Sequence, residues 1–329
     1  MFLRNDTPLL ARLSRGHLGE RVAIATVVID VAYRIGPRGL DLLDELPEAR
    51  PTDPPDVAGY VVWEGVSVTA AGDVEGPSRA PFVRQVTLEV AGAVRRLAVL
   101  GDRVWARRLG GGLDASDTRP FDVIPLSFAR AFGGKHAVPP GRDPAGLPHP
   151  GFEASYTLNP YGVGFYRTEA DATGAPLPNI ERPEQLLRRW SDTPEPAGFS
   201  PCPDLAGLRL ARALSRARLD PTAVTTYDLF EAGVHKVMPH HAPGDLVIED
   251  PAAVRSVKLD GLVGGPIAVT APAPPCGVLF RRGPKRVAVT PKLRTLHLDA
   301  SARTCRAAFD AAIRYDPERP ARIAQVVTS

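Results

Sequence analysis

The chain has 329 residues, of which 44% are hydrophobic and 23% are charged, so it is long enough to bury a real core in one large or two moderate domains. Its 40 basic and 37 acidic residues nearly cancel to a net charge of +3. That balance excludes a nucleic-acid signature from composition alone, because such a signature needs basic residues clustered on one face. The 35 prolines and 30 glycines predict many turns and few long helices.

Several features predict a cytoplasmic protein with reduced thiols. The longest apolar stretch, residues 22–32, contains Thr26 and Asp30 and is too short to span a bilayer. The N-terminus lacks a basic segment followed by an apolar one, so we expect no signal peptide. The cysteines are odd in number and contain no Cys-x-x-Cys pair, which predicts free thiols acting as small core residues. They are Cys202, Cys276 and Cys305.

Strand patterns dominate the first part of the chain. Residues 21–35 are rich in valine and isoleucine and predict a long, mostly buried strand, whereas 85–90 alternate polar and apolar side chains as a half-buried strand does. A proline-rich surface loop is expected at 47–56. The other strands that we expect are 57–63, 66–70, 94–100 and 103–105. Together they predict a mainly antiparallel N-terminal β lobe over residues 1–134.

The middle of the chain, residues 135–205, is expected to be a loop-rich region with short helices. A helix is predicted over 183–190, because proline is favoured in a first turn. The strongest helix pattern runs from Asp204, a capping residue, to Arg218, and Pro221 ends it.

Strand patterns return after residue 255, separated by glycine or proline. Residues 304–309 and 313–315 are expected to add edge strands. The other predicted strands are 255–259, 266–270, 277–281, 285–290 and 293–298. We therefore expect a mainly β fold of two packed, sandwich-like antiparallel lobes, the second of which, with the helix, covers residues 206–329.

Five short motifs follow one another between Gly101 and Pro201, and they combine glycine, proline and aromatic residues. Glycine and proline fix unusual backbone geometry, and aromatic side chains anchor it against a core. A loop stretch of such composition is more often functional than filler. The motifs are Gly-Asp-Arg-Val-Trp (101–105), Pro-Leu-Ser-Phe-Ala-Arg-Ala-Phe-Gly-Gly (125–134), Asn-Pro-Tyr-Gly-Val-Gly-Phe (159–165), Leu-Pro-Asn-Ile-Glu-Arg-Pro (177–183) and Pro-Ala-Gly-Phe-Ser-Pro (196–201).

This ordered series resembles the bacterial "domain of unknown function 2169" family, over most of the chain and most strongly from Val83 to Pro201. Members of that family sit beside type VI secretion genes and are understood to be adaptors or chaperones that load toxic effectors onto the secretion spike. The resemblance implies one family domain, with an effector protein and a spike protein as partners. It implies no cofactor, nucleic acid or membrane.

The resemblance also gives the candidate partner-binding or motif-loop residues. These are Arg103, Trp105, Arg130, Phe132, Gly133, Gly134, Asn159, Pro160, Gly162, Gly164, Phe165, Pro178, Asn179, Glu181 and Phe199. Trp105, Phe132 and Phe165 suit either a core anchor or the centre of an interface; for Trp105 we expect the core.

The charged and amide residues of the motifs suggest a structural role. Arg103 and Arg130 lie in successive motifs, and an arginine paired with a carboxylate would lock these loops together. Asn179 tolerates left-handed backbone geometry, and Glu181 can accept hydrogen bonds from loop amides.

Two other groups of polar residues could form sites. His235, His240, His241 and Asp245 are the densest set of possible metal ligands, but their spacing matches no zinc signature, and adjacent histidines in a strand point to opposite faces. We favour a polar loop without a metal. Arg209, Arg212 and Arg216 share a helical face, for which we favour a solvated surface over an anion site.

The sequence contains no catalytic motif. It has no Gly-x-Ser-x-Gly elbow, no phosphate-binding loop and no His-Glu-x-x-His. We therefore expect a non-enzymatic protein. Two alternatives remain open, namely a hydrolase-like enzyme with its site among loops 135–203, since catalytic triads assemble from distant positions, and a structural component of a secretion or phage-like assembly.

Overall fold

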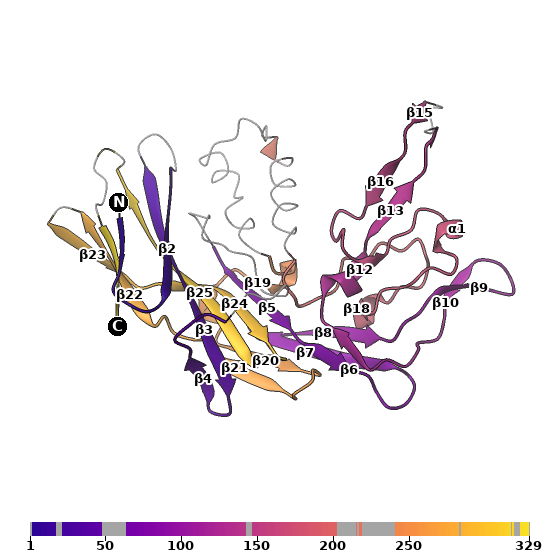
Figure 1. Cartoon of the computed structure of the whole chain (residues 1–329), viewed down its shortest axis with the longest axis horizontal. Coiled ribbons are helices and arrows are strands. Elements are labelled where there is room, and N and C mark those ends of the chain that lie inside the picture. Colours follow the sequence, from indigo (N-terminus) through magenta and orange to yellow (C-terminus); the bar gives the residue numbers. More distant parts are fainter. Residues whose placement is uncertain are drawn as a thin grey trace.

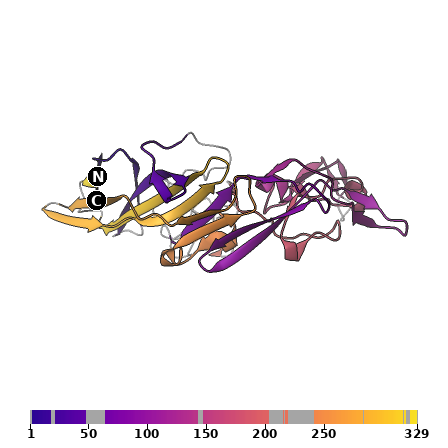
Figure 2. The ribbon, with the colours of Figure 1, turned by 90° about the horizontal axis from the view of Figure 1, so that it is seen from below.

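The computed structural model describes residues 2–17, 22–47, 64–142, 147–202, 215, 217–218, 241–282, 284–316, 318 and 323–328. The fold is mainly β, which confirms the predicted class. The molecule is elongated, with both termini near one end and much of the segment between residues 101 and 183 toward the other (Figures 1 and 2).

The largest sheet has seven strands in the order β19, β5, β24, β25, β3 and β2, with β4 paired to the end of β3. Its neighbours are antiparallel except β5 and β24, which are parallel. The strands are β2 (Leu10–His17), β3 (Ala23–Gly36), β4 (Gly39–Leu42), β5 (Val66–Ala71), β19 (Val247–Ile248), β24 (Lys292–Asp299) and β25 (Thr304–Tyr315).

A second, five-stranded antiparallel sheet has the order β18, β8, β7, β20 and β21. Its strands are β7 (Val83–Val90), β8 (Ala93–Leu100), β18 (Ile180–Glu181), β20 (Ser256–Asp260) and β21 (Ile267–Thr270). Both large sheets therefore combine strands from the first 134 residues with strands from the last third of the chain.

A four-stranded sheet of order β1, β26, β22 and β23 lies at the end of the molecule that carries the termini (Figure 1). It consists of β1 (Phe2–Asn5), β22 (Cys276–Arg282), β23 (Lys285–Val289) and β26 (Ile323–Thr328), and β1 and β26 are parallel.

Five two-stranded ladders surround the motif region. They are β6 (Asp73–Glu75) with β11 (Val123–Pro125), β9 (Trp105–Arg107) with β10 (Leu113–Ala115), β12 (Phe132–Gly133) with β17 (Val163–Gly164), β13 (Lys135–Val138) with β16 (Phe152–Ser155), and β14 (Gly141–Arg142) with β15 (Pro148–His149).

Helical structure in the described residues is short. One α-helix, α1 (Glu169–Ala172), begins at a capping box in which the Thr168 hydroxyl and the Asp171 carboxylate each accept a backbone N–H of the other residue. The remaining helical turns are of the 3-10 type, at Phe128–Arg130, Pro183–Gln185, Gly244–Leu246 and Pro251–Ala253.

One continuous apolar core joins the three larger sheets. It contains Val27 and Ile29 of β3, Val99 of β8, Phe280 of β22 and Phe309 of β25, all with little or no exposed surface. The prediction that residues 21–35 form a long buried strand is confirmed, because nearly every residue of β3 is buried. Among the described residues, no helix has the length and apolar character to cross a bilayer.

Two predictions of local structure are wrong. Residues 183–190 form a single 3-10 turn, because side-chain carboxylates take the next amides: Glu181 accepts the N–H of Leu187, and Asp192 accepts those of Arg188 and Arg189. Residues 304–315 form one strand inside the large sheet, between β24 and β3, and not two edge strands.

The remaining differences are smaller. The strand expected at 103–105 begins only at Trp105, after an isolated bridge between Val104 and Pro176. The strand at 57–63, most of the loop at 47–56 and most of the helix at 204–218 lie outside the described residues.

Candidate functional site

The five motifs assemble into one unit, called here the motif cluster (residues 101–105, 125–134, 159–165, 177–183 and 196–201). The β12–β17 ladder joins the second and third motifs. β18, from the fourth, pairs with β8 just before the first, and Ile180 bridges to Ala131 of the second. Segments that are far apart in sequence thus meet at one end of the molecule (Figure 1).

A buried ion pair connects the first and fourth motifs. Arg103 forms a salt bridge with Glu181, and its guanidinium also donates to the Pro178 carbonyl at 2.9 Å. The second carboxylate oxygen of Glu181 accepts the N–H of Leu187 at 2.7 Å. Burial raises the pKa of Glu181, while the Arg103 charge and these hydrogen bonds lower it. The expected arginine–carboxylate lock is present, with Glu181 as the carboxylate.

Asn179 connects three motifs through a buried side chain. Its Nδ2 donates to the Leu100 carbonyl and to Asp102, both at 3.0 Å, and its Oδ1 accepts from Arg130 at 3.3 Å. The Asn179 backbone also donates to the Arg130 carbonyl and accepts from Leu100. Its role is this bridging and not left-handed geometry, because it is absent from the positive-φ residues of the described chain.

Glycines allow the second and third motifs to approach closely. Gly133 has a φ of +149°, and a Cβ on it would lie 2.1 Å from the Asn159 carbonyl oxygen. A Cβ on Gly162 would lie 2.5 Å from the Ala131 carbonyl oxygen. Asn159 is fully buried and donates through Nδ2 to the carbonyls of Phe128 and Phe132 at 2.7 and 3.0 Å. Side chains at either glycine would force these backbones apart.

A separate aromatic core fills the motif cluster. Trp105 is 1% exposed and packs in a cluster with Phe132, Leu177 and Leu187. The Phe132 ring meets Tyr156 edge-on at 4.9 Å, and Tyr156 in turn lies 5.6 Å from Phe165. These contacts place Trp105 and Phe132 in the core and Phe165 at its half-buried margin.

The fifth motif attaches the cluster to the rest of the molecule. The carbonyl of Phe199 accepts the N–H of Ala70 in β5 at 2.8 Å, and the Phe199 side chain belongs to the main core. The Gly198 backbone lies against the ring of Phe128, where a Cβ would come within 3.1 Å. The motif cluster is therefore continuous with the seven-stranded sheet.

Most of the candidate residues are inside the protein. Arg130 is exposed, and Pro160, Gly162 and Phe165 are half-buried. The buried ones are Arg103, Trp105, Phe132, Gly133, Gly134, Asn159, Gly164, Pro178, Asn179, Glu181 and Phe199. Such residues determine the shape of a surface without forming it. Some apolar side chains in or near the motifs reach the surface but are absent from the candidate residues. They are Leu109, Val123, Leu186 and, within the third motif, Tyr161.

The possible ligand groups fall partly outside the described residues, which include neither His235, His240 nor the arginines at 209, 212 and 216. Asp245 pairs with Arg182 at 3.2 Å and with Arg95 at 3.6 Å, and the His241 carbonyl accepts the N–H of Cys202. No group of three or more potential metal ligands occurs among the described side chains. All three cysteines are free and buried, as predicted.

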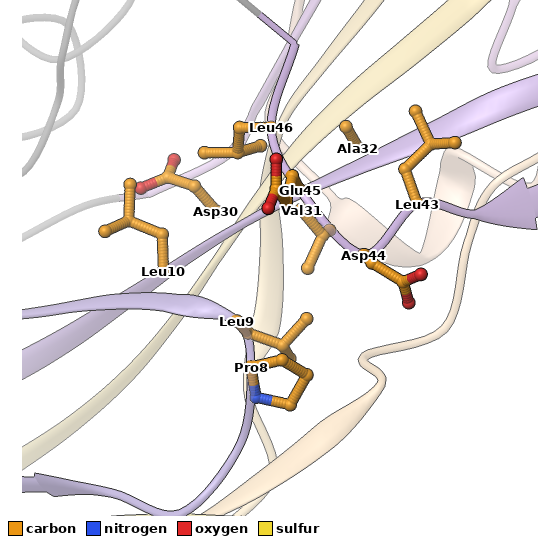
Figure 3. A pocket seen from close by; sticks show the side chains of 10 residues that line it. All are labelled: Pro8, Leu9, Leu10, Asp30, Val31, Ala32, Leu43, Asp44, Glu45 and Leu46. Carbon is orange, nitrogen blue, oxygen red and sulfur yellow. The ribbon is translucent and has the colours of Figure 1, made fainter.

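Two hollows lie away from loops 135–203. One, of about 320 Å³, is lined by apolar residues of segments 8–10 and 43–46 together with Asp30, Asp44 and Glu45 (Figure 3). The carboxylates of Asp30 and Asp44 lie on opposite sides of it (Figure 3). The other, of about 610 Å³, is lined by Tyr33, by residues in 37–42 around the β3–β4 turn, and by residues in 268–275. Neither lining contains a serine, cysteine or histidine.

Comparison with known proteins gives one match. A family model described as "Uncharacterized protein conserved in bacteria (DUF2169)" matches residues 22–309. No curated protein matches the chain, and no solved structure matches it.

Proposed function

This chain belongs to the DUF2169 family of bacterial proteins, and we propose that it is a non-enzymatic adaptor or chaperone that binds a toxic effector and helps to load it onto a type VI secretion spike. The effector and the spike protein are its proposed partners, and the cytoplasm, where effectors are made, is its proposed location. The genomic setting of the family, given above with the resemblance, supplies the identity of these partners.

One observation carries the proposal of a binding role. Three side chains that hold the motif cluster together, those of Arg103, Asn179 and Glu181, are buried and already paired. Arg103 pairs with Glu181, and Asn179 hydrogen-bonds the exposed residues Asp102 and Arg130. A catalytic site would instead present some of these groups to a cleft. Polar groups that pair with one another make the loops rigid. A rigid surface is preorganised for its partner and loses little conformational entropy on binding.

The surface over this rigid unit suits a polypeptide partner. The tip of the β9–β10 hairpin carries Leu109, which is fully exposed. Val123 and Leu186, which are close in sequence to residues of the motif cluster, also expose apolar side chains. Apolar groups on ordered loops lose little conformational entropy on binding and are typical of interface centres. Their polar surroundings, such as Arg107 and Arg108, suit a complex that must later release its cargo.

Co-expression with the products of neighbouring genes tests the proposal. We expect a toxin or a spike protein to co-purify with the chain. Leu109→Asp should reduce the recovered partner by about tenfold or more, since removing a central anchor weakens binding by about 2 kcal/mol, and it should leave the thermal melt unchanged. Leu42→Asp, on β4 of the large sheet and 49% exposed, is the matched control. If every neighbour elutes separately at micromolar concentration, the proposed function is wrong.

A further inference from the structure

The β22–β23 hairpin is the most basic part of the described chain. Residues 281–286 read Arg-Arg-Gly-Pro-Lys-Arg, and the sequence contains no aspartate or glutamate between Asp260 and Asp299. The overall charge is nearly balanced, so this is a local excess of positive charge. Local excess of one sign is the feature that attracts a partner of the opposite sign.

The two strands place like charges directly opposite each other. In the antiparallel register, Arg281 faces Arg286 and Arg282 faces Lys285. Like charges in opposing positions destabilise a strand pair. The hairpin therefore carries these residues at a cost to its own stability, a cost that a bound anionic group would remove.

Part of this charge is not neutralised within the protein. Arg281 lies near Asp6, whose pKa is lowered by hydrogen bonds from Arg4 and Gln325 and, more weakly, by the Arg281 charge. Lys285 and Arg286 are exposed, and within the described residues neither takes part in an ion pair. The strand β23 therefore keeps two cations available to a partner.

The same strand has an unpaired backbone edge within the described part of the chain. β23 is the last strand of its sheet and pairs only with β22. Its first four residues are exposed and its fifth is half-buried, so both faces are accessible, and Val287 is 41% exposed. The hairpin stands out at the end of the molecule opposite the motif cluster (Figures 1 and 2).

We propose that the free edge of β23 binds an extended, acidic segment of a partner polypeptide, which adds to the sheet as a further strand. The backbone N–H and C=O groups of the edge would pair with the segment, and its carboxylates would lie beside Lys285 and Arg286. A second copy of this chain is disfavoured as the occupant, because its own β23 would bring the same cations together. A nucleic acid would satisfy the charges but would leave the backbone edge unpaired.

Charged residues on an edge strand can also serve only to prevent aggregation. Preventing aggregation requires a charged residue on the edge strand. It does not require cations in opposing positions or a long segment without aspartate or glutamate. The opposing pairs therefore favour a binding role. This inference specifies that the segment bound by the protein is acidic and extended. It rests on the proposed function for the identity of the partner protein.

A peptide assay tests the edge without any effector. The probe is a fluorescein-labelled peptide of ten residues in which pairs of glutamates alternate with pairs of valines, so that carboxylates lie on both faces of the strand, as Lys285 and Arg286 do. Its anisotropy is measured with the full chain. Lys285→Glu together with Arg286→Glu should weaken binding by about tenfold or more, whereas Arg38→Glu with Arg79→Glu, two exposed arginines elsewhere, should change it by less than about twofold. Should the reversed variant misfold, Lys285→Gln with Arg286→Gln gives the same comparison without new charges.

Two further measurements separate strand pairing from simple charge attraction. The same peptide N-methylated at its valines lacks half of the N–H groups on each of its two edges and should bind about tenfold more weakly. Hydrogen exchange at residues 285–289 should slow when the unmodified peptide binds. Equal binding of the N-methylated peptide, or equally tight competition by single-stranded DNA of the same charge, would overturn the proposal. Peptide binding without any co-purifying neighbour would leave the edge site in place and refute the proposed function instead.

Discussion

The buried Arg103–Glu181 pair predicts that removing one partner harms the protein more than removing both. In an Arg103→Met variant the Glu181 carboxylate keeps the Leu187 N–H but loses its countercharge, in a site where the carboxyl residue is 3% exposed. An unpaired buried charge is strongly unfavourable, so the carboxyl will take up a proton. Replacing Glu181 by glutamine as well supplies a neutral group of the same shape. We therefore expect Arg103→Met/Glu181→Gln to be more stable than Arg103→Met at neutral pH.

The size and pH dependence of this difference follow from the ordinary pKa of 4.5. Protonating such a carboxyl at pH 7 costs about 3 kcal/mol, which is the most that the double variant can regain. Without Arg103, burial raises the pKa of Glu181 in the folded state above that of the unfolded chain. The carboxyl's contribution to stability is therefore full below about pH 4.5 and is lost as the pH rises through the folded pKa.

Urea denaturation of the two variants between pH 4.5 and pH 8 measures this difference. The curves should coincide near pH 4.5, where glutamine and protonated glutamate are equivalent, and should separate as the pH rises. Wild type and Glu181→Gln complete the cycle and give the coupling energy of the pair. If Arg103→Met is as stable as the double variant at pH 7, the carboxylate is solvated or otherwise neutralised, and the assignment of Glu181 to a dry, Arg103-dependent site is refuted.

Three further predictions concern burial. Trp105→Ala should cost about 3–5 kcal/mol in a thermal or urea melt and lower the soluble yield, because the ring is 1% exposed; a normal melt with lost partner binding would contradict the core assignment. Gly133→Ala should cost about 2 kcal/mol or more, whereas Gly39→Ala, which also has positive φ (+128°) but nothing within 4 Å of its Cβ, should cost clearly less; equal losses would exclude the backbone clash as the cause. The third prediction concerns the thiols of Cys202, Cys276 and Cys305, which are at most 3% exposed. None should react with Ellman's reagent until guanidinium unfolds the chain, and burial also raises the pKa of Cys305 to about 12. A thiol that reacts in the folded protein would refute its burial.

Local patterns predicted most of the strands because a strand's hydrophobic period is visible in a few residues. Residues 304–315 show where that information ends. Asp310 interrupts the apolar pattern and indicates a break, yet in the structure its carboxylate accepts from Arg294 at 2.6 Å inside the sheet. The partner lies on the preceding strand, so a buried ion pair makes one interior strand out of what the sequence divides into two edges.

The motifs indicated which residue types would form the internal contacts of the cluster. They did not indicate which residue would pair with which. Arg103 was expected to meet a carboxylate, but its neighbour in sequence, Asp102, binds Asn179 instead. Glu181, far along the chain, is the partner, and it also takes the amide of Leu187 that a helix over 183–190 would have used. Such pairings arise from the fold, because chain reversal brings together groups whose separation in sequence has no pattern.

The location of the two proposed contact regions suits a protein that joins two others. The motif cluster is fixed to β5 through Phe199, and the β22–β23 hairpin is fixed to the same core through Phe280. A single packed interior transmits position with little deformation. The exposed loops of the cluster and the basic edge of β23 lie toward opposite ends of the long axis (Figure 1). A partner held at one end leaves the other end uncovered, which is the geometric requirement for bridging a cargo and a receiving complex.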